Sequence, residues 1–184
     1  MSGPRSCHTQ VMSTPPRTLL VLRHSKSAYP EGVADFDRPL APRGVRDAVT
    51  LGGWLLGQGL LPDLVVCSTA ARTRQTWDLI NDQLVWPDQD ATVVYDPRVY
   101  DAALADLMDI VAETPPETAI LALVGHNPGV ARLVLTLTGE SGLSFPTSAV
   151  AMIDIHQDWD RVIPGHGSLA GLWTPKGGSA VLRD

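Results

Sequence analysis

Short aliphatic runs alternate along this chain with longer segments in which apolar residues recur at helical spacing. The aliphatic runs are typical of buried β-strands, and they lie at 18–22, 62–68, 91–96, 118–125, 148–155 and 167–175. The segments with helical spacing lie at 41–60, 70–84, 101–114 and 127–139. This alternation of strands and helices predicts a three-layer α/β/α sandwich with a mostly parallel central sheet.

The chain contains no internal repeat and no linker long enough to divide it, so we expect a single domain over residues 17–184. The polar stretch before it, residues 1–16, is expected to be a flexible N-terminal extension. Residues 176–184 contain few apolar positions and are predicted to be weakly ordered.

The composition is that of a globular protein with more acidic than basic residues. Hydrophobic residues make up 44% of the 184 positions, charged residues make up 18%, and the formal net charge is −6. The negative charge argues against general binding to nucleic acid or to a membrane surface. No apolar stretch approaches the roughly 18 residues of a membrane span, and no secretory signal is visible. We therefore expect a cytoplasmic protein, with a monomer or weak dimer as its working state.

Three predicted strands end in polar residues that suit phosphate chemistry. Arg23 and His24 end the first strand, Ser68 ends the second, and His126 follows a later one. Ligands of open parallel sheets bind beyond the carboxyl ends of the strands, so these residues are expected to face one crevice. Arg72 follows in the next helix. Arginine offers a planar donor fork to phosphoryl oxygens, and neutral imidazole is nucleophilic near neutral pH.

Motifs for metals and nucleotides are absent from the sequence. There is no His-Glu-x-x-His, no Cys-x-x-Cys and no acidic pair at ligand spacing. A Walker loop and a Gly-x-Gly-x-x-Gly fingerprint are also missing, which weighs against nucleotide-driven chemistry. We therefore expect neither a metal nor a cofactor.

The segments "LVLRHSKS", "VVCSTAARTRQT" and "LVGHNPG" resemble, in residues and spacing, the three signature segments of the histidine phosphatase superfamily (phosphoglycerate mutase-like). The resemblance covers residues 18–174 and is strongest to the short SixA-like phosphohistidine phosphatases. It implies that His24 is the nucleophile and becomes transiently phosphorylated. It also implies that Arg23 and Arg72 bind the phosphoryl oxygens and that His126 lines the same pocket.

The same resemblance suggests further residues around the phosphoryl group. Ser68 opens the S-x-x-x-R segment and is expected to help position its arginine. Ser25 stands where the superfamily often has glycine. Lys26 either contributes positive charge at the rim of the site or is a surface residue without a role in it. The stretch "DFDRPLAPRG" matches the family's "D-x-x-R-P-L-T-x-x-G" loop, so Asp37 and Arg38 are expected to shape the rim of the site.

The sequence lacks a clear candidate for the general acid. Many superfamily enzymes use a Glu in this role, and no clear equivalent of that Glu is present here. Asp101 is the nearest candidate, and its alternative role is that of a helix N-cap. An alkoxide leaving group needs a proton far more than the imidazole of a phosphohistidine does. A site without a dedicated acid therefore suits phosphohistidine or a phosphoanhydride better than a sugar phosphate.

These observations predict a metal-independent phosphatase that works through a phosphohistidine enzyme intermediate. No long insertion offers a lid, so an open site that admits phosphohistidine on a protein partner is favoured. The alternatives are a phosphatase of small phosphorylated metabolites, whether phosphoesters or nucleotides, and a catalytically silent phosphate-binding module. Because only neutral histidine can attack phosphorus, activity is expected to be lost below the pKa of His24.

Overall fold

A computed structural model describes residues 17–87 and 90–181, so the predicted extension over residues 1–16 lies outside the described residues. Seven strands form one sheet: β1 (Arg17–Arg23), β2 (Leu64–Ser68), β3 (Thr92–Asp96), β4 (Ile120–Gly125), β5 (Val150–Ile155), β6 (Gly167–Thr174) and β7 (Gly178–Val181). The α-helices are α1 (Pro42–Gly57), α2 (Ala71–Asn81), α3 (Leu104–Ala112) and α4 (Gly129–Thr138). Short 3₁₀ turns are η1 (Asp35–Asp37), η2 (Pro97–Val99) and η3 (Trp159–Arg161).

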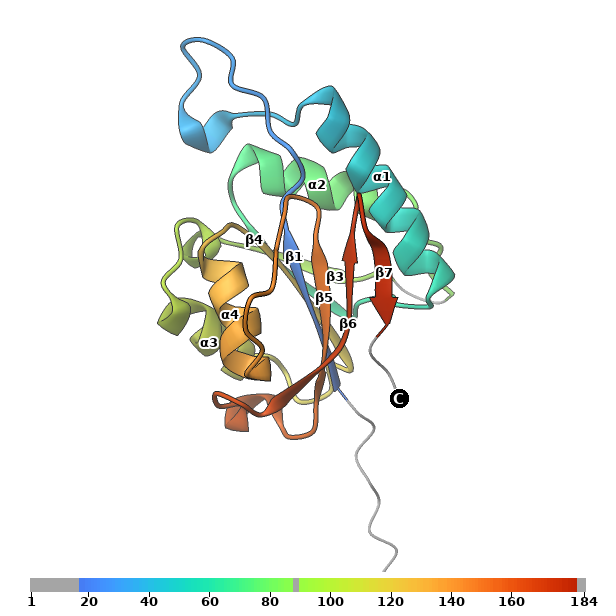
Figure 1. The fold of residues 1–184 in the computed structure, drawn as a ribbon, viewed down its shortest axis with the longest axis vertical. Helices are drawn as coiled ribbons and strands as arrows, with labels where there is room; N and C mark the ends of the chain where they lie inside the picture. The colour runs from blue at the N-terminus through green and yellow to red at the C-terminus, as the bar shows by residue number, and fades with distance from the viewer. Residues whose placement is uncertain (1–16, 88–89, 182–184) are drawn as a thin grey trace, which may run out of the picture.

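The strand order is β3-β2-β4-β1-β5-β6-β7. The first four strands in this order are mutually parallel, whereas β5, β6 and β7 are each antiparallel to the strand before them. Helices α1 and α2 cover one face of the sheet, and α3 and α4 cover the other (Figure 1). The predicted three-layer α/β/α sandwich is confirmed, with the parallel half of the sheet formed by the earlier strands.

Strand β1 shows why helices cover both faces of the sheet. Its successive side chains alternate between the faces, as in any strand. Leu19 and Val21 pack with α3 and α4, whereas Leu20 and Leu22 pack with α1 and α2. All four side chains are fully buried, so the continuous aliphatic run is the sequence of a central strand.

Within the segment 176–184, which was expected to be weakly ordered, residues 178–181 form β7, because the free edge of β6 supplies backbone partners after a turn that ends at Gly178, where φ is +63°. One predicted detail is wrong. Asp101 is not the N-cap of α3, which begins at Leu104 after Ala103. The turn after η2 places Asp101 at φ +53°, outside the extended conformation of a cap, and the Asp106 carboxylate accepts the Ala103 N–H instead.

The loop after β1 is tied to the start of α1. The Ala41 N–H donates to the Lys26 carbonyl oxygen at 2.8 Å. Gly44 lies directly against that carbonyl, and a side chain at position 44 would clash with the Lys26 backbone. The glycine of the "RPLAPRG" stretch is therefore required for close packing, and this packing fixes the backbone just beyond His24. In the described part of the chain, no helix has both the length and the apolar character needed to cross a bilayer.

Candidate active site

The register of the parallel strands brings two histidines together. Arg23 of β1 is paired with Gly125 of β4, so the next residues, His24 and His126, leave the sheet side by side. The His24 N–H continues the ladder by donating to the Gly125 carbonyl at 3.0 Å. The two imidazole rings are 5.0 Å apart between centroids and tilted by 52°. Residues about a hundred positions apart thus share one end of the sheet.

The His24 ring is oriented by its own neighbour. Its Nδ1 lies 2.7 Å from the Ser25 carbonyl oxygen, and because a carbonyl only accepts, Nδ1 carries the hydrogen. The lone pair of the neutral ring is therefore on Nε2. Burial lowers the pKa of His24 to about 4, and the nearby positive charges of Arg72 and Arg23 act in the same direction. At neutral pH His24 is an uncharged imidazole with a free Nε2 lone pair.

His126 is held by the end of β2. Its Nε2 lies 2.8 Å from the Ser68 hydroxyl oxygen, and its Nδ1 is buried with no hydrogen-bond partner among the described residues. Burial, followed by the proximity of His24, lowers the pKa of His126 to about 3. The rings of Tyr100 and His126 pack edge to face, with centroids 5.5 Å apart. A second neutral imidazole with an unused buried nitrogen therefore borders His24.

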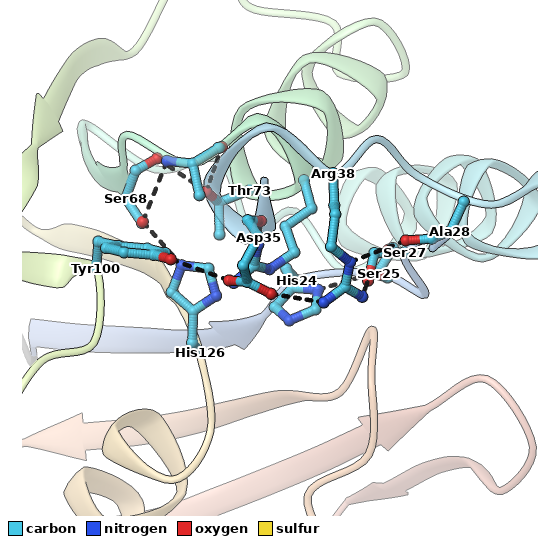
Figure 2. Close-up of polar contacts among 12 residues, drawn as sticks. His24, Ser25, Ser27, Ala28, Asp35, Arg38, Ser68, Thr73, Tyr100 and His126 are labelled. Atoms are coloured by element: carbon cyan, nitrogen blue, oxygen red, sulfur yellow. Dashed lines mark hydrogen bonds and ion pairs between the residues drawn. The ribbon is translucent and has the colours of Figure 1, made fainter. Parts of the chain in front are cut away.

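Asp35 organises the arginines around the site (Figure 2). Arg72, on the first turn of α2, donates from Nη1 to the Asp35 carbonyl at 2.6 Å and from Nη2 to its carboxylate at 3.0 Å. The carboxylate also accepts from Arg38 at 2.6 Å and from the Tyr100 hydroxyl at 2.9 Å. The Tyr100 hydrogen bond, with those of Arg38 and Arg72, lowers the pKa of Asp35 to about 2. Asp35 is therefore a carboxylate that positions guanidiniums, and it holds no proton to donate.

Beside His24 lies a small cavity of about 120 Å³. Its walls include Arg23, His24, Lys26, Ser27, Arg38 and Arg72. Arg23 is half-buried, donates to the Phe145 carbonyl at 2.9 Å, and leaves its Nε buried without a partner among the described residues. No acidic side chain in the described part of the chain lines this cavity. Four cations around one imidazole make an anion site.

Several predicted residues lie elsewhere than expected. The Ser25 hydroxyl is fully buried and accepts from Ser148 at 2.7 Å, so it points away from the cavity. The Ser68 hydroxyl lies 2.8 Å from His126 Nε2, so it positions that imidazole, and it accepts from the Ala70 N–H just before α2 at 3.4 Å. Asp37 is exposed, and the aspartate that contacts Arg38 and Arg72 is Asp35. Asp101 is exposed and does not line the cavity.

Sequence reasoning missed three residues of the site. Asp35 had a signal, because in the D-x-x-R pattern the aspartate three positions before Arg38 is Asp35. Tyr100 directly precedes Asp101 in the sequence, but no motif marked it as a residue of the site. Ser148 has φ +63°, and its N–H donates to the His24 carbonyl at 3.2 Å, a role that no sequence pattern announces.

The buried neutral histidines predict an acid-sensitive fold. In the unfolded chain both titrate near pH 6.5, whereas in the folded protein their pKa values are about 4 and about 3. The unfolded state therefore binds protons first, and stability should fall as the pH drops from about 6.5 toward 4. Thermal midpoints between pH 7 and pH 4 check this. His126→Gln should lose less stability on acidification than the parent protein, whereas the matched change at exposed His166 should follow the parent. Equal losses in all three would contradict the assignment.

The mixed sheet and the anion cavity at its strand ends define a phosphoglycerate mutase-like α/β protein. A sequence model of the histidine phosphatase superfamily (branch 1) matches residues 19–111. An uncharacterized protein of Mycobacterium tuberculosis is 38% identical over 165 residues, covering 84% of this chain and all of the relative. The chain belongs to the histidine phosphatase superfamily.

Two further similarities relate the chain to one group within this superfamily. The phosphohistidine phosphatase SixA of Escherichia coli is 27% identical over 140 residues, covering 76% of this chain and 86% of that protein. A candidate phosphohistidine phosphatase SixA from Nakamurella multipartitia has a similar structure, with a TM-score of 0.79 and 29% identity over 90% of this chain and 99% of that one. The predicted resemblance to SixA-like proteins is confirmed, and it supports phosphatase activity.

Proposed function

We propose that this protein is a metal-independent phosphatase that removes phosphoryl groups from phosphohistidine on a protein, through a phosphorylated His24. The observation that carries the proposal is the position of His24: a neutral imidazole with a free Nε2 lone pair lines a cavity that also holds Arg23 and Arg72. These guanidiniums stabilise the charge on the three oxygens of the phosphoryl group during transfer. The similarity to phosphohistidine phosphatases supports the same substrate class.

In the first step His24 Nε2 attacks phosphorus, and a new N–P bond forms as the N–P bond of the substrate breaks. The bonding electrons go to the substrate imidazole, which leaves as neutral histidine when its distal nitrogen carries a proton. In the second step water attacks phosphorus and the His24 N–P bond breaks. Its electrons return to Nε2, and both protons of the water go to the product, which leaves as dihydrogen phosphate. His24 is then neutral again, with its hydrogen on Nδ1.

The ionised state of Asp35 favours this substrate over an alkyl phosphate. Asp35 is the carboxylate nearest to the arginines, yet its pKa of about 2 leaves it unprotonated at neutral pH. Asp101, the acid suggested by the sequence, does not line the cavity. An alkoxide would depart without a proton donor, whereas an imidazole whose distal nitrogen is already protonated needs no donor from the enzyme.

The test compares substrates under identical conditions. Measured kcat/KM should be about 10²-fold higher for a phosphohistidine peptide than for sugar phosphates or nucleotides, which is the low end of what a missing general acid costs. The reverse preference would identify a phosphatase of small phosphorylated metabolites. Phosphate binding without turnover of either substrate would identify a silent binding module.

A further inference from the structure

A second, larger cleft adjoins the phosphate cavity. Its volume is about 380 Å³, and it shares Arg23, Lys26 and Thr147 with the first cavity. Arg43 and Lys176 contribute the remaining charged side chains. The four cations come from the end of β1, the loop after it, the start of α1 and the turn between β6 and β7. We call these four residues and the space between them the basic cleft.

The charge of the basic cleft is neutralised only in part by neighbouring residues. No acidic residue in the described part of the chain lines it. Arg43 makes one ion pair, from Nε to Asp47 at 3.3 Å, and Lys26 lies 5.6 Å from the centre of the exposed Tyr29 ring. Lys176 makes no ion pair within the described ranges. In a protein with a net charge of −6, a cleft lined by four cations, one of them in an ion pair, is a local reversal of sign.

We propose that the basic cleft docks acidic side chains that flank the phosphorylated residue of a protein substrate; this inference rests on the function proposed above. The net negative charge of this protein repels an acidic partner at long range, so a local positive surface beside the cavity orients the encounter. Lys26 and Lys176 are exposed and sit on long flexible stems, which suits an extended anionic surface. A small second anion would instead be held by buried donors in fixed geometry.

The experiment uses residues outside the catalytic cavity. Charge reversal at the far side of the cleft, Lys176→Glu and Arg43→Glu, is compared with Arg161→Glu, which makes the same charge change in η3 at the opposite end of the sheet. Each protein is assayed on phosphohistidine peptides with acidic or neutral flanking residues and on p-nitrophenyl phosphate, which has no flanks.

We expect each cleft variant to lower kcat/KM by about tenfold on the acidic peptide and to leave the neutral peptide and p-nitrophenyl phosphate unchanged. The loss should appear mainly in KM and should vanish at about 1 M salt, where the Debye length is about 3 Å. Arg161→Glu should behave as the parent protein.

The remaining outcomes overturn the inference in different ways. Turnover of both peptides without any effect of the cleft variants overturns the docking role and leaves the proposed function standing. Turnover of p-nitrophenyl phosphate but of no phosphohistidine peptide overturns both. A small phosphate ester with a second anionic group is assayed beside them; a loss of kcat/KM on this ester in the cleft variants, with both peptides unaffected, would make the cleft a small-molecule subsite and overturn docking of a protein.

Discussion

His24→Ala should lower kcat on a phosphohistidine peptide by about 10⁴-fold and abolish the covalent phosphoenzyme. The substitution removes the Nε2 lone pair that attacks phosphorus, and no other group in the cavity replaces it. His126 borders His24, but its Nε2 is engaged by the Ser68 hydroxyl and its Nδ1 is buried. The measurement is single-turnover kinetics with a labelled phosphoryl group, followed by isolation of the protein to detect the transient N–P bond.

His166→Ala is the matched control, because His166 is exposed and lies outside the site. His166→Ala should retain full activity and should form the labelled phosphoenzyme to the same extent as the parent protein. His24→Gln keeps the volume of the side chain, so its thermal midpoint separates loss of chemistry from loss of folding. A folded His24 variant that still forms the phosphoenzyme would place the nucleophile on another residue.

Arg72→Lys should lower kcat/KM by about 10²-fold, although the positive charge is retained. The guanidinium holds the Asp35 backbone with one terminal nitrogen and its carboxylate with the other, while remaining in the wall of the cavity. A single ammonium cannot keep both anchors and also present two parallel donors to phosphoryl oxygens. The loss should appear in kcat as well as in KM, since charge on those oxygens is greatest in the transition state.

Arg74→Lys, two residues further along α2, provides the control for this change. Arg74 is exposed and lies over the Tyr95 ring at 5.4 Å, away from the cavity. It should leave kcat/KM unchanged. If Arg72→Lys were as active as Arg74→Lys, the bidentate grip of Arg72 on the phosphoryl group would be disproved.

The convergence of His24 and His126 could be predicted because it depends on topology alone. Two parallel strands of the same sheet end on the same side, whatever their side chains do. The identity of the aspartate at the rim does not follow from topology, although the D-x-x-R spacing indicates Asp35. Asp35 and Asp37 belong to one 3₁₀ turn and share residue type and charge, and the path of the loop brings Asp35 to Arg72.

Ser25 and Ser148 show the same limit. Both are small polar residues near the site, and a serine next to the nucleophile suggests contact with substrate. In the folded protein their hydroxyls bond to each other in a fully buried position, where they fix the turn that carries His24. Burial and direction of a short side chain depend on segments 123 positions apart, which no local pattern records.

The sequence by itself determined the three-layer architecture and the pair of histidines beyond the sheet, because burial of aliphatic strands follows directly from hydrophobic periodicity. Only the tertiary structure decided that Asp35 anchors the arginines, that residues 178–181 extend the sheet, and that four cations meet in a basic cleft. These features arise where loops and edges pack, and there the free energy depends on contacts between distant segments and not on the spacing of residues along the chain.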